Sequence, residues 1–324
     1  MKCLKCIIFN VDHGFCAFVK SPNGYGLLID CGSRARFSPI KWIRRHYTVG
    51  NPGFRFFDGR RFAKCIISHL HADHFDDIAS FYKDRKDKPK ILTRDKKIIK
   101  FLDDKIRECE KEGKKKKAKV LRTFKKFSDE YDQDVKKQPE WGFDEFKTYQ
   151  LSLADAKNIN EDREKITNNR SFLIGIKYAG SKILIPGDME ADAWKRAFDS
   201  ERFEDVVEGT NFFVASHHGH KSGFTSEILD YSGKPDIYIV SAKSGDESVD
   251  TSYSKKENSN GYRISGRGYK SHMVSTREEQ KSIEIAILED GSSSINLVHA
   301  QENLSEIQAS LRVKKTERLT KAWR

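Results

Sequence analysis

The chain has 324 residues, of which 37% are hydrophobic and 33% charged, and its formal net charge is +12. This length is sufficient for one large α/β domain with a buried core. No apolar run approaches the roughly 20 residues that span a bilayer, and the N-terminal stretch CIIF is too short for the apolar region of a signal peptide. We therefore expect a cytoplasmic protein with no membrane span.

The net charge is concentrated in one segment. Residues 83–126 contain 20 Lys and Arg residues against 8 Asp and Glu residues, an excess equal to the net charge of the whole chain. Lysine-rich surfaces of this kind bind anions, so the charge favours an anionic substrate or partner.

The first 33 residues predict β-structure. The apolar runs KCLKCIIFNV, GFCAFVKS and LLIDCG are bounded by Gly and Asn, and PNGYG predicts a turn between strands. Most of the six cysteines lie in such strand-like contexts without a paired framework, which is typical of reduced core thiols. Cys3 and Cys6 spell CxxC, but no second pair accompanies them, so we interpret both as small hydrophobic residues rather than zinc ligands.

A histidine-rich motif follows the next predicted strand, FAKCIIS. HLHADH, residues 69–74, contains three of the ten histidines in the chain. On an extended segment His69 and His71 face the same side, and Asp73 and His74 follow where the chain turns into FDDIASFY. Imidazole and carboxylate groups suit Zn, Mn or Fe, so we interpret these four residues as metal ligands. The alternative is a polar loop in which Asp73 caps a helix.

The lysine-rich segment predicts two amphipathic helices that are separated near Gly113, because apolar residues recur at helical spacing on both sides of this glycine. A charged helical hairpin that binds no ligand remains an alternative interpretation, since Lys114 to Lys117 are equally typical of a solvated surface.

Strand patterns resume after the lysine-rich segment. SFLIGIKYAGSKILIPGD predicts two strands about a Tyr-Ala-Gly-Ser turn, followed by a helix from about Ala191 to Phe198. FFVASHHGHKSG and DIYIVSA predict two more strands. Asp188 and the pair His217 and His218 therefore each follow an apolar strand. If the strand geometry continues, one of the two histidines points away from the other.

The C-terminal third contains a segment without apolar periodicity. Residues 244–272 interleave tyrosines with Arg and Lys, which predicts a mobile loop on the substrate side. Its Tyr and Arg side chains are Tyr253, Tyr262, Arg263, Arg267 and Tyr269. SIEIAILEDGSSSINLV predicts a final β-hairpin, and the basic tail over 301–324 predicts a helix.

These motifs, taken in order, resemble a known family. FNVDHGFCAFVKSPNGYGLLIDCG, HLHADH, IPGDME and ASHHGHKSG are similar to the metallo-β-lactamase fold, and most similar to the metallohydrolase domain of ComEC-type DNA-uptake proteins and their soluble relatives. The resemblance covers residues 1 to about 240 and VSTREEQKSIEIAI. It implies an α/β fold, a four-layer αββα sandwich, as one hydrolase domain over residues 1–300. The lysine-rich helices form an insertion over about 83–147, and residues 301–324 form the tail.

The resemblance implies two divalent metal ions at the strand ends. It places His69 and His71 on one metal, and Asp73 and His74 on the other. Asp188 is the implied bridging carboxylate. One of His217 and His218 completes the second site. The implied ligands are His69, His71, Asp73, His74, Asp188, His217 and His218. Asp73 or Asp188 orients the hydrolytic water, in the role of a catalytic residue.

Further residues are implied to surround the metals. Asp30 matches an aspartate of the family that orients a histidine ligand. The alternative is that Asp30 is only a polar residue at the end of a strand. His13 stands where the ComEC pattern has glutamine and faces the substrate. Lys221 is placed to neutralise charge on phosphoryl oxygens, unless it is a surface lysine. His220 and Ser222 belong to the same surroundings.

One ligand of the wider fold is missing. Members of the metallo-β-lactamase fold usually supply another histidine between the first histidine cluster and the bridging carboxylate. In this chain no histidine occurs from Phe75 to Ser216. ComEC-like members carry an Asn/Ser stretch there, which TNNRSFL matches with Asn168, Asn169 and Ser171. One metal is therefore expected to be weakly held, and the site suits Zn or Mn.

A metal pair of this kind promotes in-line displacement at phosphorus, and the basic segment supplies a track for a phosphate backbone. We therefore predict a phosphodiester hydrolase, a nuclease that acts on DNA or RNA. Hydrolysis of a cyclic nucleotide or another small nucleotide signal is an alternative, in which the lysine-rich helices bind partner proteins or form a homo-oligomer. The missing histidine argues against lactone or β-lactam hydrolysis. A non-catalytic scaffold is the remaining alternative.

Overall fold

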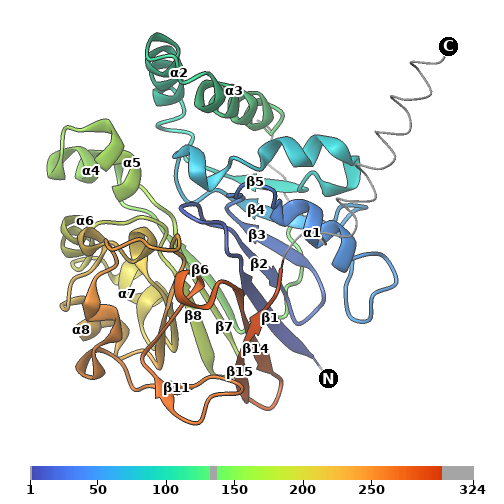
Figure 1. Ribbon diagram of the computed structural model, residues 1–324, viewed down its shortest axis with the longest axis vertical. Helices are drawn as coiled ribbons and strands as arrows, with labels where there is room; N and C mark the ends of the chain where they lie inside the picture. Colours follow the sequence, from blue (N-terminus) through green and yellow to red (C-terminus); the bar gives the residue numbers. More distant parts are fainter. Residues whose placement is uncertain (1, 132–136, 301–324) are drawn as a thin grey trace.

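The computed structural model describes residues 2–131 and 137–300, which form a mixed α/β structure, as the sequence predicts. The basic tail over residues 301–324 lies outside the described residues. Figure 1 shows two large sheets at the centre of the molecule with helices on either side.

The first sheet contains seven strands in the order β15-β14-β1-β2-β3-β4-β5. The pairs β3/β4 and β4/β5 are parallel, and the remaining pairs are antiparallel. Both faces of this sheet are buried, because Leu4, Cys6 and Ile8 lie on one face of β1 and Ile7 on the other. The strands are β1 (Cys3–Ile8), β2 (Ala17–Lys20), β3 (Gly26–Ile29), β4 (Phe62–Ile66), β5 (Ile91–Thr93), β14 (Ser282–Leu288) and β15 (Ser293–Val298).

The second sheet contains six strands in the order β13-β10-β9-β8-β7-β6, of which β8, β9, β10 and β13 run parallel. The strands are β6 (Glu145–Tyr149), β7 (Leu173–Tyr178), β8 (Ser181–Ile185), β9 (Phe212–Val214), β10 (Ile237–Val240) and β13 (Met273–Ser275). A separate short pair consists of β11 (Tyr262–Arg263) and β12 (Lys270–Ser271).

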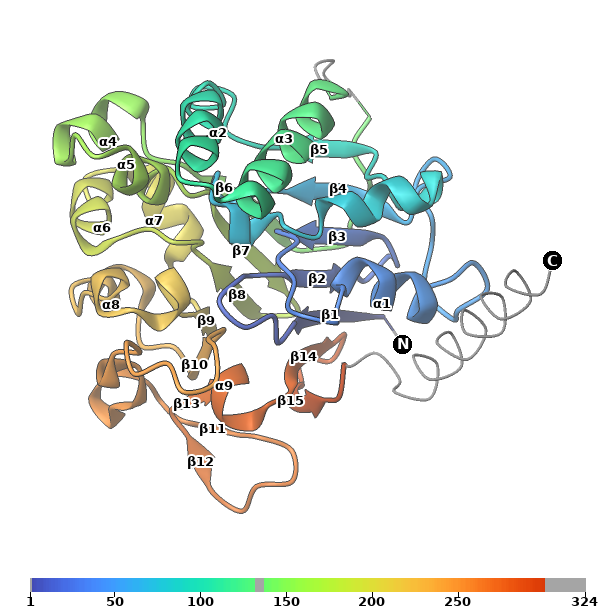
Figure 2. The ribbon, with the colours of Figure 1, turned by 45° about the horizontal axis from the view of Figure 1, so that its top comes forward.

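The two sheets pack face to face. Ile8 and Ile29 of the first sheet share one apolar cluster with Ile185 and Val214 of the second. The outer face of the first sheet is covered by α1 (Pro39–His46), α2 (Phe101–Lys111) and α3 (Lys115–Asp129). The outer face of the second is covered by α4 (Leu153–Ile159), α5 (Arg163–Asn169), α6 (Ala191–Ala197), α7 (Glu201–Val207) and α8 (Ile228–Ser232). Figure 2 shows these two groups of helices on their separate sides.

Shorter helices complete the described chain. The α-helix α9 (Thr276–Glu279) leads from β13 to β14. The 3-10 helices are η1 (Ala72–His74), η2 (Ile78–Lys83), η3 (Arg85–Asp87), η4 (Ser216–Gly219), η5 (Lys221–Gly223), η6 (Thr251–Ser254) and η7 (Lys256–Asn258). Within residues 2–131 and 137–300, no helix has the length and apolar character that a membrane crossing requires.

The lysine-rich segment forms the two predicted amphipathic helices, α2 and α3, with Gly113 between them at a φ of 72°. The apolar stripe of α3 faces the core, because Leu121, Phe124 and Phe127 are buried. The ring of Phe124 stacks on that of Phe75, with the centroids 4.0 Å apart. The segment therefore packs directly behind the turn that carries HLHADH.

The prediction for residues 244–272 is wrong in part. Tyr253 is 1% exposed and packs against Tyr238 and Phe224 in the core, because the chain returns along the second sheet at η6. Tyr262 is half-buried, and its hydroxyl shares a hydrogen bond with Ser293. These two tyrosines are therefore not a stacking surface for a substrate, whereas Tyr269 is exposed.

The packing of α3 predicts a stability effect. Replacing Phe124 by Ala should lower the free energy of unfolding of the whole protein by about 3–5 kcal/mol, because it removes a fully buried aromatic ring. Lys126→Ala on the exposed face of the same helix is the control and should change the free energy by less than about 0.5 kcal/mol. Denaturant titration measures both. Equal unfolding midpoints for the two variants would contradict the described packing.

Candidate metal centre

Four strand ends meet at one edge of the paired sheets. Parallel strands present their C-terminal ends on the same side, so β3 and β4 bring Asp30 and His69 together, while β8 and β9 bring Asp188 and His218 together. The face-to-face packing then joins the two pairs. The Nε2 atoms of His69 and His218 both lie 3.5 Å from Asp188 Oδ2, which confirms the predicted convergence of these segments.

Asp188 lies at the centre of the cluster. His74 Nε2 approaches its other oxygen, Oδ1, at 3.4 Å. Two sets of residues could each hold a metal ion, because within each set the ligand atoms all lie within 4.8 Å of one another. His69, His74 and Asp188 form one set, and Asp73, His74 and His218 form the other. Both sets combine imidazole and carboxylate groups, which are the ligands of catalytic zinc and manganese sites.

The outer nitrogens of the histidines contact hydrogen-bond acceptors. His74 Nδ1 lies 2.8 Å from Asp30 Oδ2, and His218 Nδ1 lies 3.2 Å from the carbonyl oxygen of Ser241. Ser68 donates its hydroxyl to Asp30 and lies 3.1 Å from His69 Nδ1. A nitrogen beside an acceptor carries the proton, so the Nε2 atoms of these histidines present lone pairs to the centre when the rings are neutral.

The lone pairs face one another at short distance. His74 Nε2 and His218 Nε2 are 3.2 Å apart, beside the buried carboxylate of Asp188. Two neutral acceptors repel at this separation, and a negative carboxylate adds to the repulsion. The arrangement is therefore stable only with positive charge between the groups, which a proton or a metal ion supplies. The donor atoms present fit a divalent metal.

The shifts in pKa of His74 and Asp188 also favour positive charge in the cluster. Burial alone would lower the pKa of His74, but the carboxylates of Asp188 and Asp30 raise it well above its ordinary value. Burial would raise the pKa of Asp188, but the nearby histidines hold it well below its usual range. Burial lowers the pKa of His69, which therefore stays neutral and available as a ligand.

Both His217 and His218 face Asp188, because the strand geometry that would turn one of them away from the other does not continue to these residues. Their φ angles are 50° and 56°, in the left-handed region, and this turn ends the strand geometry. His217 Nε2 lies 3.9 Å from Asp188 Oδ2, while its Nδ1 lies 2.9 Å from the hydroxyl of Ser222. His218 is the closer of the two to the carboxylate.

His71 occupies the outer side of the cluster, and its neighbour Glu164 on α5 was not found from the sequence. His71 Nδ1 lies 3.1 Å from His69 Nε2, and Glu164 Oε2 lies 2.6 Å from His71 Nε2. The contact with His71 lowers the pKa of the Glu164 carboxyl well below its usual range. The other oxygen of Glu164 pairs with Lys105 on α2.

The histidines therefore group differently from the pairing that the resemblance implies. His74 belongs to both sets of ligand atoms, and His71 belongs to neither set. The physical reason is the position of Glu164, which draws one nitrogen of His71 away from Asp188. Through Nδ1, His71 still adjoins the set that contains His69.

The predicted Asn/Ser stretch braces the loop that carries Asp188. Ser171 Oγ accepts a hydrogen bond of 2.9 Å from the backbone N–H of Asp188. Asn169 Oδ1 accepts from the backbone N–H of Glu190, and the amide of Asn168 donates to the Glu190 carboxylate. These contacts fix the loop backbone, and the side chain of Asp188 is thereby held toward the histidines.

The remaining predicted residues lie at the periphery. Asp30 is the exception, because it is fully buried and its Oδ2 lies 2.8 Å from His74 Nδ1. His13 is exposed, with its Nδ1 4.0 Å from Asp246 Oδ2. His220 and Ser222 form a hydrogen-bonded pair beside His217. Lys221 is exposed and forms no ion pair within the described part of the chain.

Comparison with known proteins identifies no relative: no family model and no curated protein matches the chain. The site is therefore interpreted from its geometry. The buried groups of His69, His74 and Asp188 could hold a metal ion, and Asp73, His74 and His218 form a second, partly buried group that could do so.

Asp188→Asn should reduce metal binding, because the amide removes the negative charge around which the imidazoles gather. We expect the content of Zn or Mn per chain, measured by mass spectrometry after dialysis against a metal buffer, to fall by at least half. Asp192→Asn, an exposed change on α6, is the matched control and should retain the wild-type content. Equal metal content in both variants would show that Asp188 is not a ligand.

Glu164→Ala should strengthen the metal affinity, because it frees the imidazole of His71, which lies 3.1 Å from His69, to turn toward the cluster as an added ligand. Titration with Co²⁺, followed by its visible absorption, measures affinity and coordination together. Glu164→Gln retains an oxygen acceptor for His71 and should gain less affinity. Glu201→Ala on α7 is the exposed control. An unchanged Co²⁺ spectrum and affinity in Glu164→Ala would show that Glu164 does not keep His71 from binding the metal.

Proposed function

We propose that the chain is a metal-dependent phosphodiester hydrolase of the metallo-β-lactamase fold, and that it acts on nucleic acid. The observation that carries this proposal is the ring of imidazole nitrogens around the buried Asp188 carboxylate. Support for the fold comes from the order of the motifs HLHADH, IPGD and ASHHGH along the chain, and from two facing sheets with helices on both outer sides.

Each residue of the centre has a role that follows from its contacts. His69, His74, His218, Asp73 and Asp188 would hold one or two divalent ions, Zn or Mn. Such ions supply Lewis acidity, which lowers the pKa of a bound water and neutralises charge on phosphoryl oxygens. Asp30 and Ser241 fix the ring orientation of two histidines. Asp73 is 44% exposed at its side chain and is therefore the carboxylate placed to accept a proton from an incoming water.

The substrate class rests on unpaired charge beside the site. Helix α3 packs on η1, which carries Asp73 and His74. Several of its lysines are exposed and form no ion pair with any residue in 2–131 or 137–300: Lys115, Lys116, Lys117, Lys119 and Lys126. Unpaired surface cations bind phosphate backbones through the release of counterions, so α3 offers a track for a polymer that reaches the metal centre.

Wild-type protein with Mn²⁺ or Zn²⁺ should cleave labelled single-stranded DNA, double-stranded DNA or RNA. Asp188→Asn should lower the rate at least about 100-fold, because removing a ligand costs more than removing a residue that orients one. Asp192→Asn should cleave at the wild-type rate. Gel analysis of cleavage products and their time course measures the effect.

Binding of the uncleaved polymer should weaken with salt, and replacing Lys115, Lys116 and Lys117 by Ala should make this salt dependence less steep. The matched control replaces three exposed lysines elsewhere: Lys234, Lys255 and Lys256. Cleavage of cyclic dinucleotides alone, with binding that is insensitive to salt, would instead indicate a hydrolase of small nucleotide signals. Protein without bound metal and without activity would indicate a scaffold.

A further inference from the structure

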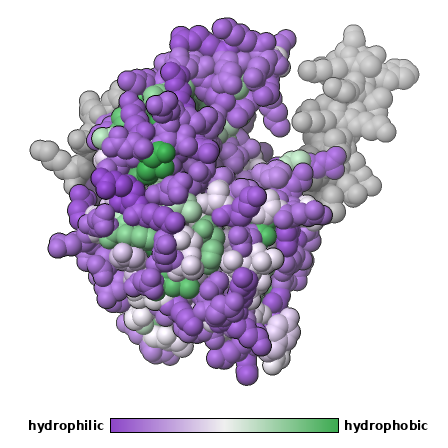
Figure 3. Space-filling model, turned by 90° about the vertical axis from the view of Figure 1, so that its left-hand side faces the viewer, coloured by the Kyte–Doolittle hydropathy of each residue, from purple (hydrophilic) through white to green (hydrophobic). Residues whose placement is uncertain are grey.

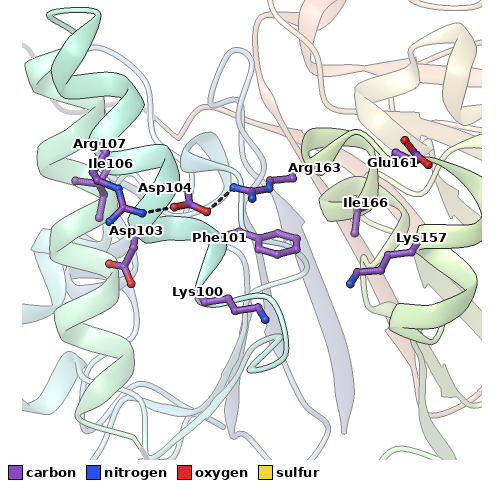
Figure 4. A pocket seen from close by; sticks show the side chains of 10 residues that line it. All are labelled: Lys100, Phe101, Asp103, Asp104, Ile106, Arg107, Lys157, Glu161, Arg163 and Ile166. Atoms are coloured by element: carbon purple, nitrogen blue, oxygen red, sulfur yellow. Dashed lines mark hydrogen bonds and ion pairs between the residues drawn. The ribbon is translucent and has the colours of Figure 1, made fainter.

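A large cavity opens between α2 and the helix pair α4 and α5. Its volume is about 940 Å³, and Phe101, Ile106 and Ile166 form its apolar part. Figure 4 shows the ring of Phe101 projecting into the gap, with Lys100 below it and Lys157 on the opposite wall. A cavity of this size accommodates a small organic ligand.

This cavity adjoins a smaller one beside the metal centre, with which it shares three lining residues. A second cavity of about 300 Å³ is lined by His71, Lys105 and Glu164. Phe101, Asp104 and Arg163 line both cavities. The larger cavity is therefore separated by these shared residues from the smaller one, which His71 of the histidine cluster lines.

The charges in the larger cavity leave cations available. Asp104 is shared by two guanidinium groups, those of Arg107 and Arg163. Asp103 pairs with Lys125. Lys100 and Lys157 are exposed and lack an ion-pair partner in the described residues. The cavity thus combines a partly buried aromatic ring, apolar walls, two uncommitted ammonium groups and the exposed carboxylate of Glu161.

The side of the molecule on which α4 and α5 lie is mostly hydrophilic. Figure 3 shows the side of the molecule that lies at the left in Figure 1, where hydrophobic residues occupy small areas among hydrophilic ones. An apolar recess with cations at its rim suits a small ligand that has both a flat ring and an anionic group.

We propose that this cavity binds a nucleotide unit of the substrate, adjacent to the phosphodiester that the metal centre cleaves. The proposal rests on the proposed function and names a subsite for it. The base stacks on Phe101, since every base presents a π-face to an aromatic side chain. Arg163, whose guanidinium lies 5.4 Å from the Phe101 ring centroid, and Lys157 attract the phosphate and sugar oxygens.

A pair of chromogenic diesters tests the subsite. Thymidine 5′-(p-nitrophenyl phosphate) carries a base, whereas methyl p-nitrophenyl phosphate does not, and both release the same leaving group. Phe101→Ala should lower kcat/KM for the thymidine diester about 5-fold or more, the loss expected for one stacked base. It should leave kcat/KM for the methyl diester within about twofold of the wild-type value, because the metal ligands are untouched.

Matched variants exclude a general loss of structure. Phe56 also lies beside a guanidinium, with Arg61 4.9 Å from its ring centroid, but it belongs to the loop before β4, so Phe56→Ala should leave the ratio of the two diesters unchanged. Phe101→Leu keeps apolar volume without the aromatic face and should show most of the loss. Equal effects of Phe101→Ala on both diesters would overturn the proposal.

Binding provides a readout that does not need turnover. Calorimetric titration of the metal-loaded protein with thymidine 5′-monophosphate should show weaker binding in Phe101→Ala, whereas titration with inorganic phosphate should not change. If the wild type hydrolyses neither diester, the proposed function fails, and this titration still decides the subsite. Competition by a single-stranded oligonucleotide and by a cyclic dinucleotide then distinguishes a polymer from a small nucleotide as the source of the bound unit.

Discussion

The imidazole nitrogens of His74 and His218 lie 3.2 Å apart beside the buried carboxylate of Asp188, and the rest of the site is arranged around this contact. Acceptors on the outer side of each ring, Asp30 and the carbonyl oxygen of Ser241, direct the protons outward. The inner lone pairs then require a positive charge between them. The buried groups gathered here could therefore hold a metal ion, and the surrounding loops are arranged about them.

The architecture produces this crowding through ordinary sheet geometry. Parallel strands of both sheets end at a common edge, so segments that are more than 100 residues apart deliver short polar loops to one place. Two consecutive left-handed residues, His217 and His218, then turn both rings toward Asp188. Backbone strain of this kind is typical of functional sites, where the surrounding structure compensates for it.

The lysine-rich helices contact the centre at two points. Phe124 of α3 packs on Phe75 behind the histidine motif, and Lys105 of α2 pairs with Glu164, which in turn contacts His71. A shift of α2 would therefore move Glu164 through its contact with Lys105, and Glu164 in turn contacts His71. The same helix α2 forms a wall of the cavity that we assign to a nucleotide.

The sequence by itself determined the mixed α/β class, the strands that precede Asp188 and His217, and the two helices about Gly113, because these depend on local periodicity and on turn residues. It also indicated that HLHADH and Asp188 converge, since metal-ligand residues follow strand after strand. Only the tertiary structure decided that both His217 and His218 face Asp188, that Glu164 contacts His71 and that Tyr253 is buried. Contacts between distant segments and a left-handed backbone turn fix these features, and neither leaves a periodic signal along the chain.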